Sequence, residues 1–503
     1  MSTPSPSGRS LRVLRILAAL GGVAFLFFTS YGIDTPAARA GASARGSNGG
    51  QEACGRRRRP FLPRCEESDA TAPPAKNGGT GSVVEPKPDE PKRAGVARSA
   101  SAKASIFRRA GGFGKPWQVV DDKEGLPAGD MLLGLPLAAI DSSNGAIHVT
   151  FLSDLDELSP YPVKENAIVL WDNPKVDLEF TLDRGRVDLI NTKQKGEANV
   201  RVHIRDAIWD LALETPGTRV ALETYGRWPR GARFTKTPGP KDAPSTELAI
   251  LVLKGEAALK CKDMHFGLKA PPGPALIQWD SVTGMDDTPT KLDKLPPWAA
   301  SGSEDTPRAK VKKAALDAFR QDAASKPIGE VLDELLNSDD AYQRKLGIMA
   351  SAAFDDLDRL GKALREAKHP DVWENGVLSL RQWIGRGPGQ DQILYKGLLE
   401  KAKLNPVQAE TVMQLLHSFS DEDLANPALY QTLIDYLSHD QLAIRGLANW
   451  HLYRLVPTGR EFGYNPLAPK EERDKAIAKW KLLIPVGKMP PAAKSVEKKD
   501  ETN

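Results

Sequence analysis

The chain has 503 residues, which is long enough for two or three folded units joined by linkers. Its formal net charge of +4 is too small to predict a polyanionic partner, and its three cysteines are too few for a disulfide scaffold. Apolar residues make up 40% of the chain, and much of the Gly- and Pro-rich sequence precedes residue 115, so the folded cores are expected downstream.

The N-terminal segment has the order of features that an export signal needs. Three arginines precede an apolar run, Ile16–Phe28, that extends to Ile33. Left uncut, Ile16–Ile33 approaches the roughly 20 residues of a transmembrane helix and would serve as a signal-anchor. Ala38-Arg39-Ala40 fits the small-x-small rule for cleavage. We therefore expect a single-pass inner-membrane protein with its folded domains in the periplasm, or a periplasmic protein if residues 1–40 are removed.

Residues 41–112 are expected to form a disordered linker. This segment contains GASARGSNGG, TAPPAKNGGTGS and four consecutive arginines, Arg56–Arg59. Such sequence cannot bury enough apolar surface to offset the entropy lost on ordering. Cys54 and Cys65 flank the arginines and could close a small disulfide loop outside the cytoplasm.

Residues 113–298 are expected to form an all-β domain, either a sandwich or a short β-solenoid. Short segments rich in β-branched residues alternate with turns that contain Gly or Pro, such as Thr215-Pro216-Gly217. No helical pattern long enough for parallel crossover units intervenes. The predicted strands are Ala146–Leu152, Ala167–Asp172, Val176–Leu182, Arg186–Asn191, Ala198–Ile204, Ile208–Glu214, Arg219–Thr224, Glu247–Leu253 and Glu256–Lys260.

Three phrases in this region resemble the periplasmic FecR domain. They are DRGRVDLI (Asp183–Ile190), ALETPGTRVALE (Ala212–Glu223) and LVLKGEAAL (Leu251–Leu259), in that order. The segments Gly226–Phe234 and Ala270–Ser281 resemble an elaboration of planctomycete-type envelope proteins. The resemblance implies an extracytoplasmic binding or scaffolding module.

The chain departs from the FecR family before the apolar run. FecR proteins relay a signal to a sigma factor through a cytoplasmic N-terminal segment, whereas only about a dozen residues precede the run here. A segment this short is not expected to fold or to hold a sigma factor. The resemblance therefore implies the envelope module without the anti-sigma role.

Residues 306–487 are expected to form a helical domain. Apolar residues recur three and four apart, and polar or Pro-containing breaks separate the segments. One further helix is expected within Glu471–Pro491, and residues 488–503 are expected to form a disordered tail. The nine helices predicted before Glu471 are Lys310–Ala323, Ile328–Leu336, Tyr342–Ala353, Leu360–Ala367, Val372–Ile384, Ile393–Ala402, Ala409–Phe419, Leu429–Leu437 and Leu442–Leu455.

The breaks between these helices recur at the length of a two-helix repeat. Segments begin at Asp340, Asp371, Pro406 and Asp440, which are 31, 35 and 34 residues apart. This spacing predicts an α-solenoid, and the segment resembles HEAT-like repeats, with Arg344 and Arg445 at comparable points of their helices. An irregular single bundle is the alternative.

The sequence predicts no catalytic, cofactor-binding or metal-binding residue. The seven histidines form no HExxH pattern, and no CxxC, GxSxG or phosphate-binding loop occurs. Cys261 and His265 are four apart without a second ligand pair. Two further groups could carry chemistry: a set of acids for glycoside hydrolysis or calcium binding, and a set of tryptophans for sugar stacking. The simpler interpretations are turn formers for the acids and core residues for the tryptophans. The two groups are the acids Asp154, Asp156, Glu157, Asp172 and Asp183, and the tryptophans Trp171, Trp209, Trp228 and Trp279.

The preferred hypothesis is a multidomain α+β protein without enzymatic activity or cofactor. It would act as an envelope interaction or scaffold protein whose helical repeats bind a protein partner. The alternatives are a FecR-type transmembrane signalling regulator and an envelope carbohydrate-binding protein that uses the tryptophans and acids above. Export and balanced charge argue against nucleic acid as a partner.

Overall fold

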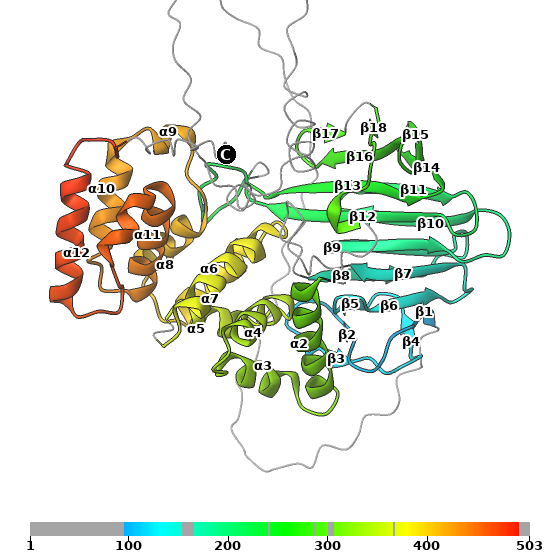
Figure 1. Ribbon diagram of the computed structural model, residues 1–503, viewed down its shortest axis with the longest axis horizontal. Coiled ribbons are helices and arrows are strands. Elements are labelled where there is room, and N and C mark those ends of the chain that lie inside the picture. The colour runs from blue at the N-terminus through cyan, green and yellow to red at the C-terminus, as the bar shows by residue number, and fades with distance from the viewer. Residues whose placement is uncertain are drawn as a thin grey trace, which may run out of the picture. The chain divides into compact units, whose positions relative to one another are not determined.

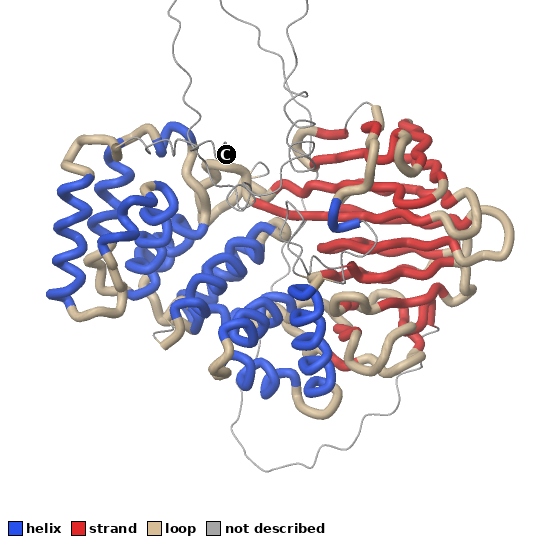
Figure 2. Tube along the Cα trace, viewed as in Figure 1, coloured by secondary structure: helices blue, strands red, loops and turns tan. Residues whose placement is uncertain are grey.

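A computed structural model describes residues 95–152, 165–239, 242–285, 288–299, 306–365 and 368–491. Within them, a β-sheet region is followed by a helical region, so the coarse prediction of an α+β protein is confirmed (Figure 1). Figure 2 shows that strands and α-helices lie in separate parts of the molecule, and among the described residues every strand precedes every α-helix. The predicted signal segment, residues 1–40 with the apolar run, lies outside the described residues, as do Cys54, Cys65 and residues 492–503.

The described strands number eighteen, and most are four to ten residues long. They are β1 (Gly95–Ser99), β2 (Ile106–Arg109), β3 (Gln118–Val119), β4 (Gly125–Pro127), β5 (Met131–Gly134), β6 (Ala139–Ser142), β7 (Ile147–Leu152), β8 (Asn166–Trp171), β9 (Leu178–Asn191), β10 (Ala198–Ile204), β11 (Ala207–Leu213), β12 (Arg219–Arg227), β13 (Ser245–Lys254), β14 (Glu256–Cys261), β15 (Met264–Lys269), β16 (Pro274–Asp280), β17 (Gly284–Met285) and β18 (Thr290–Lys291).

These strands form two sheets that share β9. Sheet A runs in the order β4-β1-β6-β7-β9-β12-β13-β16, with β17 and β18 paired to β16. Sheet B runs in the order β3-β2-β5-β8-β9-β10-β11-β14-β15. Among these pairings only β9 with β10 is parallel.

Strand β9 passes from sheet B to sheet A at Gly185. Its first half pairs with β8 and β10, and its second half pairs with β7 and β12. Gly185 has φ +93°, and a Cβ there would lie 2.2 Å from the carbonyl oxygen of Glu165. Only glycine fits such a position. The sequence predicts two strands here, Val176–Leu182 and Arg186–Asn191, whereas the structure has one.

The main hydrophobic core lies between the two sheets. Alternate residues of each strand point inward, as the period of two requires. Sheet B contributes Phe180 and Trp209, and sheet A contributes Val187, Val220 and Ile250; all five are buried in one cluster. The core therefore requires both sheets.

The β-region begins earlier than the sequence predicts. β1 and β2 lie within residues 41–112, which were expected to be linker, and Ala97, Ile106 and Phe107 are buried. The described sheet already includes Gly95 and therefore extends further towards the N-terminus than the expected start at residue 113. The prediction failed because these strands are short and interrupted by Gly, Ser and Arg, so little periodicity is visible.

The helical region matches the predicted segments closely. The helix predicted within Glu471–Pro491 ends at Leu483, before Pro485. The short α9 and the 3₁₀ segments were not predicted. The elements are η1 (Pro297–Ala299), α2 (Pro307–Ala323), α3 (Ile328–Leu336), α4 (Ala341–Ala353), α5 (Leu357–Ala363), α6 (Pro370–Gly385), α7 (Gln390–Glu400), α8 (Pro406–Leu416), α9 (Asp421–Leu424), α10 (Pro427–Tyr436), α11 (Leu442–Leu455), η2 (Pro457–Phe462) and α12 (Lys470–Leu483).

Most of these helices are arranged as successive pairs. α3 packs on α4, α5 on α6, α7 on α8 and α10 on α11. The second helices of the pairs contact one another in the series α4, α6, α8 and α11, and these four begin within two residues of the four predicted repeat starts. Arg344 donates to the carbonyls of Ser338 and Asp339 at 2.8 and 2.9 Å. Arg445 bonds in the same way to the carbonyls five and six residues before it, at 2.8 and 2.7 Å.

The first helices cover part of the outer face of sheet B. Phe107 and Leu133 point away from the core between the sheets and pack with Phe319 of α2 and Phe354 after α4. The rings of Phe107 and Phe354 meet edge to face, with 4.8 Å between their centroids. Sheet and helices therefore share an apolar core.

Candidate ligand pocket between the sheet and the helices

The end of β12 touches the end of α6 through two glycines. A Cβ on Gly226 would lie 2.4 Å from the carbonyl oxygen of Gly385, and one on Gly385 would lie 2.9 Å from Cα of Arg227. Real Cβ atoms are not found so close to backbone atoms, so this close contact between β12 and α6 requires glycine at both positions. It places the strand end directly against the helix.

The chain that follows β12 packs along the helices; we call residues 228–236 the arm. Trp228 donates from Nε1 to the carbonyl of Ile384 at 3.0 Å. Phe234 is buried in the helical core. Gln414 of α8 donates to the Phe234 carbonyl and Gln392 of α7 to that of Thr235, each at 2.7 Å. The arm is thus held by both its side chains and its backbone.

Beside this junction lies a buried cluster of charges. Asp355, just after α4, binds Arg109 of β2 at 2.6 Å and Arg386 at 2.8 Å. Arg386 also pairs with Glu165, which lies 3.3 Å from Arg184. All five side chains are less than a tenth exposed. Burial opposes ionisation of Asp355, but Arg184, Arg386 and Arg109 outweigh it and hold the pKa of this carboxyl below its usual range.

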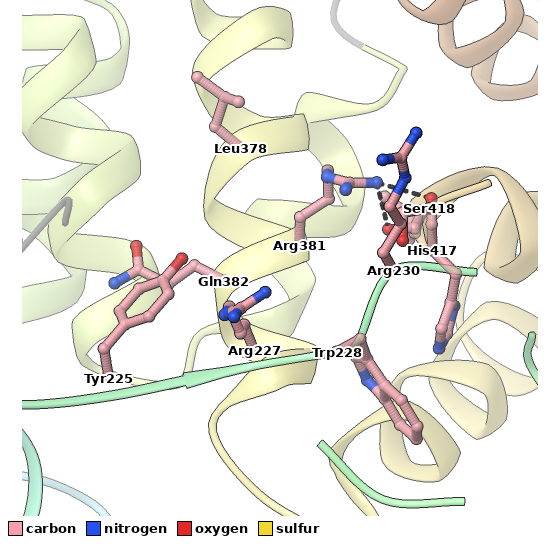
Figure 3. A pocket seen from close by; sticks show the side chains of 10 residues that line it. Tyr225, Arg227, Trp228, Arg230, Leu378, Arg381, Gln382, His417 and Ser418 are labelled. Atoms are coloured by element: carbon pink, nitrogen blue, oxygen red, sulfur yellow. Dashed lines mark hydrogen bonds between the residues drawn. The ribbon is translucent and has the colours of Figure 1, made fainter. Parts of the chain in front are cut away.

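A pocket of about 70 Å³ opens between the strand end, the arm and two helices (Figure 3). The strand and arm supply four lining residues, α6 supplies three, and the end of α8 supplies three. None of these described lining residues is an acid, and three are arginines. They are Tyr225, Arg227, Trp228, Arg230, Leu378, Arg381, Gln382, Leu416, His417 and Ser418.

Each of the three arginines is held in place by a different partner. Arg227 binds Glu247 of β13 at 2.6 Å, and Arg230 binds Asp421 of α9 at 2.5 Å. Arg381 donates from Nη1 to the carbonyls of Leu416 and His417, at 2.6 and 2.7 Å. A cation is favourable there because carbonyls at a helix C-terminus carry partial negative charge.

His417 presents an acceptor at the wall of this pocket. Its Nδ1 lies 2.7 Å from the carbonyl of Met413, so Nδ1 carries the proton and Nε2 is an acceptor. The side chain is 1% exposed, and Nε2 has no hydrogen-bond partner within the described part of the chain. Burial lowers the pKa of His417 to about 4, so the ring is neutral near pH 7.

A smaller cavity of about 20 Å³ adjoins the pocket and shares Tyr225 and Gln382 with it. Its walls include Glu165, Arg184 and Arg386 of the buried charge cluster. Polar groups therefore continue from the pocket to that cluster.

The structure separates the groups that the sequence singled out. Asp154, Asp156 and Glu157 lie outside the described residues. Asp172 is exposed, whereas Asp183 pairs with Arg184 at 2.5 Å at the charge cluster. Cys261 is buried and His265 is exposed, so the two do not form a site.

The four tryptophans do not share one face. Trp209 is fully buried between the sheets, Trp228 packs on the helices, and Trp279 is partly buried. Trp171 is 45% exposed and donates to Thr181 at 2.8 Å.

Sequence reasoning missed the pocket. The segment Gly226–Phe234 (GRWPRGARF) resembles a family elaboration, and its tryptophan and arginines are the available signal. Nothing in the sequence connects that segment with Arg381, which lies about 150 positions later.

Comparison with protein-family models, curated proteins and solved structures finds no match to the chain. Across residues 95–491, apart from the gaps given above, no helix has the length and apolar character to cross a membrane. Over the same residues, no group of three or more His, Cys, Asp or Glu side chains is arranged to hold a metal ion.

Proposed function

We propose that the chain is a non-enzymatic interaction protein of the cell envelope, in which a FecR-like β-domain carries a HEAT-like α-solenoid that binds a protein partner. The observation that carries this proposal is the series of helix pairs from α3 to α11, with successive second helices in contact. Stacked pairs of this kind create extended surfaces that suit proteins as partners. The N-terminal apolar run would anchor the molecule in the inner membrane, or be removed to leave it in the periplasm.

Three glycines support the FecR-like assignment of the sheets. Gly185, Gly217 and Gly255, one from each resembling phrase, all have positive φ, at +93°, +78° and +76°. A Cβ on Gly255 would lie 2.5 Å from Oγ1 of Thr218, so the TPGT turn and the Lys254-Gly255 turn touch. Each of the three phrases thus supplies a glycine at a position whose backbone has a positive φ, as is expected of a family motif.

The free end of the stack supports a role in protein binding. α12 closes the stack by burying Ala476, Ile477 and Trp480. Next to these, Leu482 is 81% exposed and Val486 is also largely exposed. Exposed apolar side chains that lie close together are a feature of protein-binding surfaces. The buried charges and shared core would hold the stack in a fixed orientation on the sheets.

In-cell photo-crosslinking tests the proposal. A photoreactive amino acid replaces Leu482 in one variant and Val282, a 71% exposed residue at the sheet end, in the control. We expect a discrete adduct with one protein from position 482, identified by mass spectrometry, and none from position 282. An adduct only from position 282 would indicate that the binding surface lies on the sheets and not on the helices. Sigma-factor-system components as partners would favour a FecR-type signalling regulator.

Trp171 favours one second candidate function, carbohydrate binding. Its exposed ring lies on the outer face of sheet B, 6.2 Å from the ring of His203, which pairs with Glu179 at 2.5 Å. An exposed indole beside polar groups is suited to stacking on a sugar ring. Retention on cell-wall polysaccharide that is lost in Trp171→Ala would support this function.

A further inference from the structure

We propose that two copies of this chain pair through β15, so that sheet B continues from one copy into the other. β15 is the last strand of sheet B, and among the described strands it pairs with β14 alone (Figure 1). The described strands at the other sheet edges, β3, β4, β17 and β18, have two or three residues each, whereas β15 has six. Sheets usually protect a long edge with Pro or several charges, and β15 has no Pro and one Lys, at its end. Its edge is therefore open to another strand.

The backbone of β15 presents hydrogen-bonding groups at this edge. Ala270, which follows the strand, donates its N–H to the carbonyl of Gly255 at 3.0 Å. Hydrogen-bonded pairs alternate with non-bonded pairs in an antiparallel ladder, so every second residue counted back from Ala270 bonds to β14. The residues between them, His265 and Gly267 at the centre of the strand, direct their N–H and C=O groups away from β14. Gly267 is exposed, and a Cβ built on it meets no atom within 4 Å, so a second strand can approach.

Antiparallel geometry leaves two central registers for a pair of identical strands. Directly opposite residues must lie on the same face of the sheet, so the two-fold axis passes through either Phe266 or Gly267. With the axis at Phe266, His265 of each copy lies opposite Gly267 of the other, and each such pair exchanges two hydrogen bonds. The outward backbone groups of both residues are then satisfied.

The apolar side chains of β15 favour the register centred on Phe266. On the side of the strand that faces the core between the sheets, Phe266 is partly buried, Met264 is 39% exposed and Leu268 is buried. In this register Phe266 packs against Phe266 of the second copy, and Met264 lies opposite Leu268. The hydrophobic core therefore continues across the axis and covers the two side chains that the single chain leaves partly exposed.

The charges at the two ends of the strand agree with the same register. Asp263, in the turn before β15, then lies opposite Lys269 of the other copy, and the two-fold axis repeats this pair. Lys269 is 63% exposed and also pairs with Glu256 of its own copy at 2.5 Å. With the axis at Gly267, Lys269 would lie opposite His265, which is a second basic group. An unrelated extended peptide would match the backbone but not these side chains, so the edge fits a second copy of the chain.

Disulfide crosslinking tests the register. The full chain is purified in a mild detergent, with Cys54 and Cys65 replaced by Ser and Cys261 by Ala. Phe266→Cys then places two Cα atoms about 4.5 Å apart across the axis, within the range of a disulfide. Met264→Cys, on the same face of the strand, lies about 14 Å from its counterpart, beyond that range. We expect a covalent dimer from Phe266→Cys under mild oxidation and none from Met264→Cys. A dimer from neither variant, or an equal yield from both, would overturn the proposal.

Two substitutions of Gly267 test the interface without a crosslink. Gly267→Pro removes an outward N–H that β14 does not use, so the single chain keeps its fold, which the melting temperature checks. Gly267→Ala keeps this N–H and adds a methyl group in open space. Sedimentation equilibrium should find dimers of the unsubstituted chain and of Gly267→Ala, and a dissociation constant at least about tenfold higher for Gly267→Pro. A monomeric unsubstituted chain, or an equally stable dimer of Gly267→Pro, would contradict pairing through β15. The partner contact proposed above lies on α12, so either proposal can fail without the other.

Discussion

Arg109 of β2 and Asp355 of the turn after α4 are 246 residues apart in the chain and form a buried ion pair of 2.6 Å. Asp355 also accepts hydrogen bonds from Trp383 Nε1 and Arg386 Nη1, at 2.9 and 2.8 Å. One carboxylate thus joins a strand to the ends of two helices. The backbone of Asp355 has φ +59°, in the left-handed region that few residue types adopt. Both the backbone conformation and the charge of this residue are therefore unusual.

Replacing this carboxylate should destabilise sheet and helices together. Asp355→Asn keeps the size and tolerates the left-handed backbone, but it removes the charge that faces Arg109 and Arg386. Breaking a buried ion pair from one side costs about 3–5 kcal/mol. We expect the free energy of unfolding in guanidinium chloride to fall by that amount, with fluorescence and circular dichroism transitions still coincident.

Asp358→Asn serves as the control for this experiment. Asp358 is 54% exposed and pairs with Lys401 at 2.8 Å. An exposed pair contributes less than about 1 kcal/mol. Similar losses from both variants would mean that the Asp355 cluster contributes no more than a surface pair.

Two buried histidines make the protein less stable in acid. Burial lowers the pKa of His417 to about 4 and that of His451 to about 3, while in the unfolded chain both titrate near 6.5. The unfolded state therefore binds more protons below pH 6.5. The stability that these groups confer is fully present above pH 6.5 and declines as the pH falls towards their folded pKa values.

The pH dependence of unfolding measures this effect. Between pH 6 and 4.5 each histidine should add a slope of up to about 1.4 kcal/mol per pH unit. His451→Gln keeps a donor for the Leu415 carbonyl, which lies 2.7 Å from Nε2, and should reduce the slope. His265→Gln, at an exposed position of β15, should leave it unchanged. An unaltered slope in His451→Gln would show that His451 is not buried in its neutral form.

Elements with a clear period could be predicted to the residue, whereas contacts between distant elements could not. The strand Ala198–Ile204 and the helices Ile328–Leu336 and Leu442–Leu455 have the predicted bounds because one face of each is consistently apolar. The sequence Asp183-Arg184-Gly185-Arg186 resembles a turn, yet it lies inside β9. Its charges are stabilised by partners far along the chain, which local pattern cannot reveal.

The pocket was beyond prediction for the same reason. Arg227 and Arg381 belong to a strand and a helix that the sequence assigns to separate domains. Their proximity depends on the glycine contact between Gly226 and Gly385, and glycines in a strand end and a helix end have no distinctive pattern. The arginines of the arm also have the composition of an exposed loop, so their convergence is a property of the tertiary structure.

Two tryptophans of the β-region should lose very different amounts of stability on the same substitution. Trp209→Ala removes a fully buried ring from the core between the sheets and should cost about 3–5 kcal/mol of unfolding free energy. Trp171→Ala truncates an exposed ring and should cost less than about 1 kcal/mol. Thermal unfolding monitored by circular dichroism compares them. A large loss from Trp171→Ala would show that this side chain packs in the fold and is not available to a ligand.

The contact between β12 and α6 should not tolerate a single added methyl group. Gly226→Ala would place Cβ 2.4 Å from the carbonyl oxygen of Gly385, and neither backbone can yield without separating the strand from the helix. We expect a loss of more than about 2 kcal/mol of stability and faster tryptic cleavage at Arg230 and Arg233 as the arm is released. Gly267→Ala is the control, because Gly267 of β15 has no neighbouring atom within 4 Å of a built Cβ. That variant should be neutral within about 0.5 kcal/mol or slightly more stable, since alanine restricts the unfolded chain. Equal stability and equal cleavage in the two variants would mean that the strand and the helix do not approach as closely as described.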